Sequence, residues 1–145
     1  MKDVTRQQLI ETIQNEWGTY VKRFQSLSPQ AQAAFLARQG YTRLGDLLAH
    51  IIAWWEVCQR AIPNYLADPA FSEQEYDLDT FNARAVQHFS GLDDPAIVQA
   101  FEVQRLAMLA FINRLPKAAF QNKKTADRLR MEFLGHLGEH ALPPR

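Results

Sequence analysis

The amino-acid sequence predicts an all-α protein, a four-helix bundle with a long crossover connection and short accessory helices. Four long segments carry apolar residues at the spacing of amphipathic helices. No run alternates like a strand between hairpin turns, and no internal repeat is present. The chain has 145 residues, of which 47% are apolar and 22% charged. That length and composition suit one globular domain, residues 1–145, with a core of its own.

The first long helix is expected over residues 5–25, because Thr5-Arg-Gln-Gln8 has the form of a capping box. Ser28-Pro29 then has the pattern of an N-cap followed by proline at the first helical position. A short helix over residues 30–38, closed by Gly40, is therefore predicted.

The second long helix is the most hydrophobic segment of the chain. Thr42 is expected to cap it, Asp46 lies in its first turn, and Pro63 is expected to kink or end it. Because this helix is apolar nearly all round, it is expected either at the centre of the bundle or in the interface of a homodimer. Its cysteine, Cys58, is the only one in the chain and is expected to be a buried structural thiol.

After the second long helix, a polar connection and a short helix are expected before the third long helix. Residues 64–78 are polar and are expected to form a connection across the end of the bundle. Asp79 is expected to cap a short helix closed by Gly91. The third long helix is predicted to start at Asp94-Pro95 and to stop at Leu115-Pro116.

The last long helix is predicted from Thr125 to the Pro143-Pro144 pair, and it carries two histidines. His136 and His140 are four residues apart and so lie on the same face of a helix. They share the apolar stripe of that helix, so they are expected to point inward, where an imidazole must be paired or ligated.

A third histidine, His50, lies inside the apolar run Leu47–Trp55 of the second long helix. Three inward histidines on two helices suggest one divalent metal ion held by His50, His136 and His140, with one coordination position open. The alternative is that the three histidines are core residues that only form hydrogen bonds. Gly135 and Gly138, beside the pair, are expected either to clear space for a ligand or to allow close packing of helices. His88 is expected to be exposed and not to be a fourth ligand.

Several known metal and nucleophile motifs are absent or match by coincidence. The chain has no His-Glu-x-x-His, no Glu-x-x-His pair, no Gly-rich phosphate loop, no CxxC and no Gly-x-Ser-x-Gly. His136–His140 does match His-x-x-Glu-His, but the further ligand of that motif is expected downstream, where only five residues follow. Glu139, inside this match, remains a candidate catalytic acid–base group or a partner of a ligand.

The order of these residues resembles a known family. His50 within Leu47–Trp55, followed by the pair His136 and His140, resembles the DinB-like superfamily of four-helix bundles. Asp46–His50 with Trp54, and then Asp79–Arg84, is similar to the ClbS/DfsB branch. The segment around the last two histidines departs from the tyrosine-rich form that is commoner in the family.

The resemblance implies a divalent metal, usually zinc or nickel, on the three histidines, and often a dimer. It also implies a kinship in activity: several relatives are thiol-dependent transferases or isomerases, and a ClbS member is a resistance protein that opens a cyclopropane by hydrolysis. The resulting expectation is a metal-dependent hydrolase or transferase that acts on a reactive small molecule or toxin. A protein that only sequesters a metal or ligand and a metal-free helical adaptor are the alternatives.

Further expectations concern the substrate pocket, the partners and the location. An apolar substrate pocket is expected to be lined by Trp54, Trp55 and Tyr41, although core packing is the more ordinary role for the two tryptophans. Polar contacts to a substrate are expected from Asn82, Arg84 and Glu139. Sixteen basic and sixteen acidic residues cancel, which argues against binding to nucleic acid or to an anionic membrane. The N-terminal residues have no hydrophobic signal core and no stretch is read as a membrane span, so a cytoplasmic location is expected.

Overall fold

The computed structural model describes residues 3–144, and within that range the chain forms helices and no strand. The predicted all-α class is therefore confirmed. In chain order, the helical elements are α1 (Arg6–Glu11), the π-helical segment η1 (Thr12–Glu16), α2 (Trp17–Gln25), α3 (Pro29–Gln39), α4 (Leu44–Ala67), α5 (Leu78–His88), α6 (Asp94–Arg114), α7 (Lys117–Gln121), α8 (Lys123–Arg130), the π-helical segment η2 (Met131–Gly135) and α9 (His136–Glu139).

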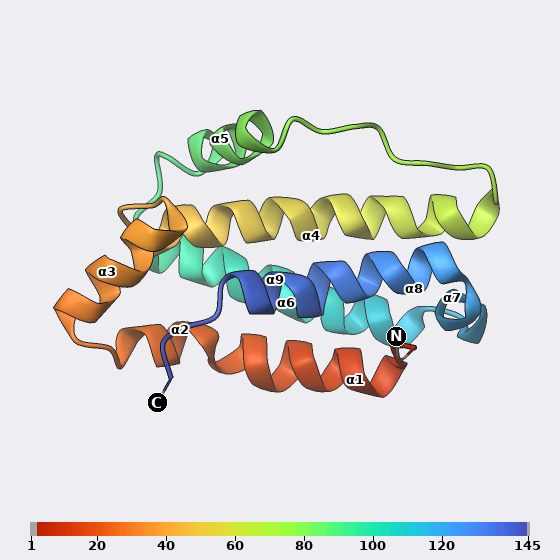
Figure 1. Ribbon diagram of the computed structural model, residues 1–145, viewed down its shortest axis with the longest axis horizontal. Helices are drawn as coiled ribbons and strands as arrows, with labels where there is room; N and C mark the ends of the chain where they lie inside the picture. Colours follow the sequence, from red (N-terminus) through yellow and green to blue (C-terminus); the bar gives the residue numbers. More distant parts are fainter. Residues whose placement is uncertain (1–2, 145) are drawn as a thin grey trace.

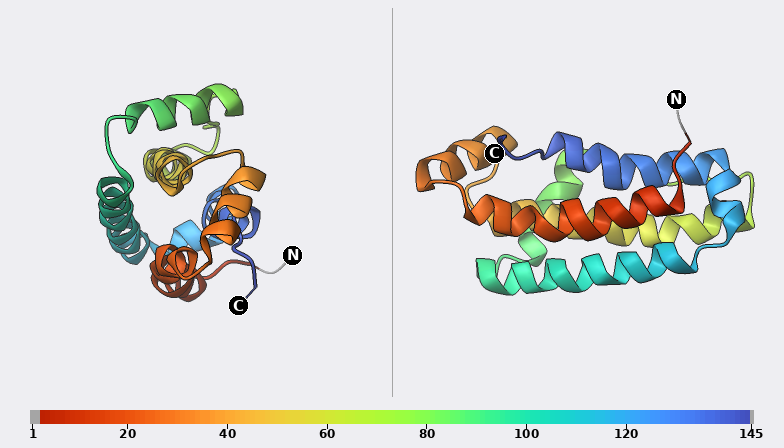
Figure 2. Two further views of the ribbon diagram at one scale, coloured as in Figure 1. Left: turned by 90° about the vertical axis from the view of Figure 1, so that its left-hand side faces the viewer. Right: turned by 90° about the horizontal axis from the view of Figure 1, so that it is seen from below.

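Four long helical stretches lie side by side along the molecule (Figures 1 and 2). α1, η1 and α2 follow one another as the first stretch, α4 and α6 are the second and third, and α8, η2 and α9 form the fourth. Seen end-on, α4 lies between α6 and the last stretch, and the first stretch lies opposite α4 (Figure 2). α3 is placed at one end, and α5 lies on the outer side of α4 (Figure 1).

The connection between α4 and α6 runs back along the length of α4 (Figure 1). α4 and α6 run in the same direction, so residues 68–93 must return to the starting end, and they form α5 on the way. The expectation that this connection lies across the end of the helices was wrong. As a result, residues 68–77 form a strap along the C-terminal half of α4.

The aromatic core lies where the first stretch faces α4. Trp17 and Trp55 meet edge to face with ring centroids 5.3 Å apart, and Phe101 and Phe133 pack against Trp55. All four side chains are buried. α4 also contacts α5, α6 and α8, so neighbouring helices cover several of its sides, in agreement with its many apolar residues.

The single thiol is also part of this core. Cys58 is fully buried, and burial raises the pKa of its thiol, with the nearby carboxylate of Glu132 adding to the shift. The expected buried structural cysteine is confirmed.

The predicted starts of the first helices hold in detail. Thr5 and Gln8 form the full capping box, and Ser28 caps α3 through the backbone N–H of Ala31. Gly40 closes α3 with φ of 85°, a left-handed conformation that favours glycine.

Later helix boundaries differ from the prediction by one to three residues. The N-caps are Asp77, Asp93 and Asn122, each accepting a backbone N–H, where Asp79, the Asp94-Pro95 pair and Thr125 were expected. In each case the actual cap is an Asp or Asn residue that lies one to three positions before the expected start. The expected start lies closer to the apolar stripe of the helix.

The second long helix also differs at both ends. The residue before α4 is Arg43, which gives no side-chain cap, and not Thr42. Pro63 does not end the helix, which continues to Ala67. Pro63 lies on the exposed side, where water can reach the carbonyl that loses its N–H partner.

α6 is long and apolar enough to cross a membrane by length and composition alone, the one such helix in the described range. About 33% of its most apolar 18-residue window is buried inside the fold. The sequence-based expectation that no stretch approaches a membrane span overlooked this helix.

Candidate metal centre

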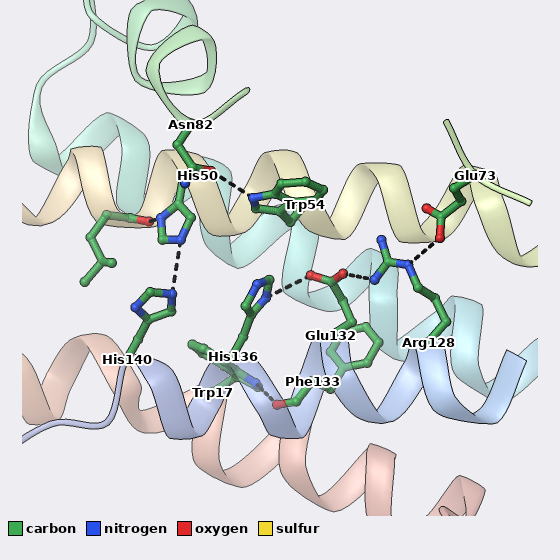
Figure 3. Close-up of polar contacts among 11 residues, drawn as sticks. Trp17, His50, Trp54, Glu73, Asn82, Arg128, Glu132, Phe133, His136 and His140 are labelled. Carbon is green, nitrogen blue, oxygen red and sulfur yellow. Dashed lines mark hydrogen bonds and ion pairs between the residues drawn. The ribbon is translucent and has the colours of Figure 1, made fainter. Parts of the chain in front are cut away.

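The three histidines singled out from the sequence lie next to one another (Figure 3). His50 comes from α4, and His136 and His140 come from the end of the last helical stretch. The ring centroids are 4.7 Å apart for His50 and His140, 5.7 Å for His136 and His140, and 6.2 Å for His50 and His136. His50 and His140 are buried, and His136 is half-buried.

The partners of two imidazoles determine which ring nitrogen carries the proton. Nδ1 of His50 is 2.6 Å from the backbone oxygen of Leu47, which can only accept, so Nδ1 donates. Nδ1 of His140 is 2.6 Å from Oε1 of Gln39, whose amide nitrogen donates to the backbone oxygen of Glu139. That second bond orients the amide, so Nδ1 of His140 donates as well.

The remaining nitrogens of these two rings face each other. Nε2 of His50 and Nε2 of His140 are 3.1 Å apart (Figure 3). With both protons on Nδ1, each Nε2 presents a lone pair, and neither can donate to the other. Two facing lone pairs are unfavourable unless a cation lies between them.

Protonation does not relieve this contact at neutral pH. Burial lowers the pKa of His50 to about 4, against a smaller raising effect of the Leu47 carbonyl. Burial, together with the charges of His50 and His136, lowers the pKa of His140 to about 3. Both imidazoles are therefore neutral at pH 7, the form that binds metals.

The third imidazole is paired with a carboxylate that the sequence analysis missed. Nδ1 of His136 is 2.9 Å from Oε1 of Glu132, within the distance of an ion pair, although neither atom meets the geometry of a hydrogen bond with any described residue. Glu132 is only 1% exposed. Metal-bound histidines commonly have their second nitrogen paired with a carboxylate in this way, which leaves Nε2 for the metal.

Glu132 belongs to a buried chain of charges. Arg128 pairs with Glu132 on one side, and its Nε lies 2.9 Å from Oε2 of Glu73 on the other (Figure 3). Glu73 comes from the strap, and its Oε2 also accepts the hydroxyl of Tyr65 at 2.7 Å. Burial works against the charge of Arg128, but the carboxylates of Glu132 and Glu73, together with Cys58, outweigh burial and raise the pKa of the guanidinium.

A sequence signal for this chain of charges did exist. Arg128, Glu132, His136 and His140 follow one another at intervals of four, which places them on one side of a helix. The Glu-x-x-His motif considered in the sequence analysis has a spacing of three residues, whereas Glu132 and His136 are four residues apart. Glu73 had no comparable signal, because it lies in an irregular segment.

Two side chains of α2 hold the helix that carries the histidine pair. The indole nitrogen of Trp17 donates to the backbone oxygen of Phe133, 3.0 Å away, within η2. The hydroxyl of Tyr20 donates to the backbone oxygen of His140 at 2.7 Å. In a π-helical turn the regular i→i−4 pattern is broken, so an outside donor can bond to a carbonyl there.

The histidines open into a cavity of about 440 Å³. Tyr41 stacks on His50, and Trp54, whose indole nitrogen donates to Asn82, forms part of the same wall. Of the predicted pocket residues, Trp55 is instead in the core and Arg84 lines a separate cavity on the far side of the strap.

Glu139 and His88 take different positions. Glu139 is exposed and lines the cavity, whereas the carboxylate in contact with a histidine is Glu132. His88 is exposed, as expected, and lines the other cavity.

The two glycines beside the histidine pair are not explained by close packing. A Cβ at Gly138 would meet nothing within 4 Å, and one at Gly135 would first meet Met131 at 3.8 Å. Neither glycine is required by a contact among the described residues.

As they stand, the side chains of residues 3–144 contain no group of three His, Cys, Asp or Glu that could hold a metal ion. The residues nevertheless fit one in chemistry and spacing. Ligand nitrogens about 2.1 Å from a tetrahedral ion are roughly 3.4 Å apart, and the ring centroids roughly 5.3 Å. The Nε2 atoms of His50 and His140, 3.1 Å apart, come close to the first value, whereas the ring centroids of His50 and His136, 6.2 Å apart, are wider than the second.

Comparison with known proteins finds no match: no protein-family model, no curated protein and no solved structure is similar to this chain.

Proposed function

We propose that this chain is a DinB-like four-helix bundle protein of the ClbS/DfsB type that binds zinc or nickel through His50, His136 and His140. Its proposed activity is that of a metal-dependent hydrolase or transferase acting on a reactive small molecule in stress or toxin resistance. The observation that carries the proposal is the pair of bare Nε2 atoms, 3.1 Å apart, on two neutral imidazoles. A shared cation is the simplest way to make that contact favourable.

The surroundings of the histidines support this assignment. Leu47 and Gln39 each accept a hydrogen bond from one Nδ1, and Glu132 lies 2.9 Å from the third, which leaves Nε2 of each imidazole available to a metal. A divalent ion bound there would supply Lewis acidity to water or to a polar group of the substrate. The chain itself orients the imidazoles, keeps two of them neutral and provides a cavity beside them.

The alternative is a protein that sequesters a metal or a ligand without turnover. One observation favours it: the carboxylate nearest to the histidines, Glu132, is already committed to Arg128 and His136. A general base for the reaction would then have to be Glu139, which lies exposed at the cavity. Multiple turnover of a reactive electrophile supports the enzyme, whereas protection that stops at one molecule per chain supports sequestration.

The first test is the metal content of the purified, untagged chain. We expect about one zinc or nickel ion per chain in the wild type and in His88→Ala, whose imidazole is exposed and lies outside the site. The His50→Ala and His136→Ala variants should lose the ion. Folded wild-type protein that takes up neither zinc nor nickel when supplied would refute the proposal.

A further inference from the structure

Two exposed apolar side chains line the cavity beside the histidines. Leu78 and Met131 are 62% and 58% exposed, and both line it. The rings of Trp54, Tyr41 and Tyr76 line the same cavity. Exposed apolar side chains that gather at a concave surface are typical of a ligand site.

Trp54 is held in place before any ligand arrives. Its indole nitrogen donates to Asn82 at 2.9 Å, and its ring lies 4.0 Å from Phe81 and 5.3 Å from Tyr76, centroid to centroid. A ring fixed in this way can bind a flat group without losing further side-chain freedom.

The charges around the cavity are unfavourable for an anionic ligand. Its lining includes three carboxylates, Glu73, Glu132 and Glu139, and a single guanidinium, that of Arg128. Arg128 is bound on both sides by Glu73 and Glu132, so it is not free to bind an anion. Away from the histidines, the charged groups of the lining carry a net negative charge, which would repel an anionic group.

We infer that this cavity selects uncharged or cationic small molecules with a flat apolar ring, which lies against Trp54, and that it rejects ligands with an anionic group away from the histidines. The inference deepens the proposed function and rests on it for the reactive end of the ligand. It favours hydrolysis over transfer from a thiol cosubstrate that carries carboxylates.

Two fluorescent dyes with the same ring system test the inference: N-phenylnaphthylamine, which is uncharged, and its sulfonated analogue, anilinonaphthalene sulfonate. Titrations use the full chain after removal of metal by a chelator. The uncharged dye should bind at one site, at least about tenfold more tightly than the sulfonate. Glu139→Gln, which removes one negative charge, should reduce this difference.

Variants place the dye in the cavity. Trp54→Ala and Met131→Ser should each weaken binding of the uncharged dye, the former by about tenfold. Leu106→Ser is the matched control, because Leu106 is an exposed apolar residue on α6 that does not line the cavity. If Trp54→Ala loses its circular dichroism signal, Trp54→Phe and Met131→Ser decide the question.

The inference is overturned if the sulfonate binds as tightly as the uncharged dye, or if the dye responds to Leu106→Ser and not to the cavity variants. Zinc content is measured on the same preparations. Dye selectivity without zinc uptake would refute the proposed function alone, whereas zinc uptake without dye selectivity would refute only this inference.

Discussion

Each of the three histidines has one ring nitrogen next to an oxygen, and the oxygens come from three different kinds of group. They are a backbone carbonyl at Leu47, an amide at Gln39 and a carboxylate at Glu132. Only the last carries charge, so Glu132 is the group expected to increase the electron density on its imidazole most strongly.

At the residue scale, Glu132→Gln is therefore expected to weaken zinc binding by about 10- to 100-fold, because an amide orients His136 less strongly and does not raise its basicity. Competition with a chelating dye measures the affinity. Glu139→Gln is the control and should change the zinc affinity little, since Glu139 is exposed. Equal losses in the two variants would show that Glu132 has no special relation to His136.

The buried imidazoles also predict a pH dependence. The pKa values of His50 and His140 fall from 6.5 to about 4 and about 3 on folding. Between pH 6.5 and those values the unfolded chain holds more protons than the folded chain, so stability decreases as the pH falls. At pH 5, His50 alone is expected to lower the free energy of unfolding by about 2 kcal/mol relative to neutral pH.

Urea unfolding of the metal-free protein at pH 7 and pH 5 measures this dependence. His140→Gln should reduce the difference between the two pH values, whereas His88→Gln, on the surface, should leave it unchanged. A difference that His140→Gln does not reduce would mean that the buried imidazole of His140 does not contribute to it.

At the element scale, α4 and α6 approach each other closely at Gly45, where a side chain would have the least space of any described glycine. A Cβ at Gly45 would lie 2.5 Å from Oδ1 of Asp94 and 2.8 Å from Cδ1 of Ile97. The backbone N–H of Gly45 also donates to Oδ1 of Asp94 at 3.0 Å. The first turn of α4 is thus fixed against the start of α6.

Gly45→Ala is expected to lower the free energy of unfolding by about 1–3 kcal/mol, because Asp94 and Ile97 must both move. Chemical denaturation measures the change. Gly138→Ala is the matched control: it has open space around its Cβ and should stabilise the protein by up to about 1 kcal/mol. If Gly45→Ala were neutral, the two helices would not be in close contact.

The π-helical segments give a second prediction at this scale. Trp17→Phe keeps most of the ring packing against Trp55 but removes the donor to the Phe133 carbonyl in η2. We expect a loss of about 1–3 kcal/mol, since a buried acceptor loses its partner. Hydrogen exchange should show the increased opening first in residues 131–140. Uniform loss of protection would contradict a local role.

At the scale of the whole molecule, the sequence predicted the helical class and the four long segments because each carries a continuous apolar stripe. The strap was not predictable to the same degree, since residues 68–77 have no periodicity and are held by single contacts such as Arg128 to Glu73. The cavity depends on those contacts.

The histidines were identifiable from the sequence because apolar neighbours make an imidazole conspicuous. Gln39 was not identifiable in this way. The four-residue spacing between Glu132 and His136 could be read from the sequence, but the burial of Glu132 could not, because a charged residue on a helix is usually in water and only tertiary packing buries Glu132. The direction of the His140 imidazole likewise depends on Gln39, which comes from α3.

The position of the three histidines along the chain has a consequence for how the site forms in a cell. His50 and His140 are separated by 90 residues, and the hydroxyl of Tyr20 bonds to a carbonyl 120 residues away. A ribosome makes the first two long helices well before the last one, so a nascent chain carries one of the three imidazoles and lacks the other two. The proposed site would therefore be complete only after synthesis of the last helix, and a bound metal would not guide the folding of the earlier helices.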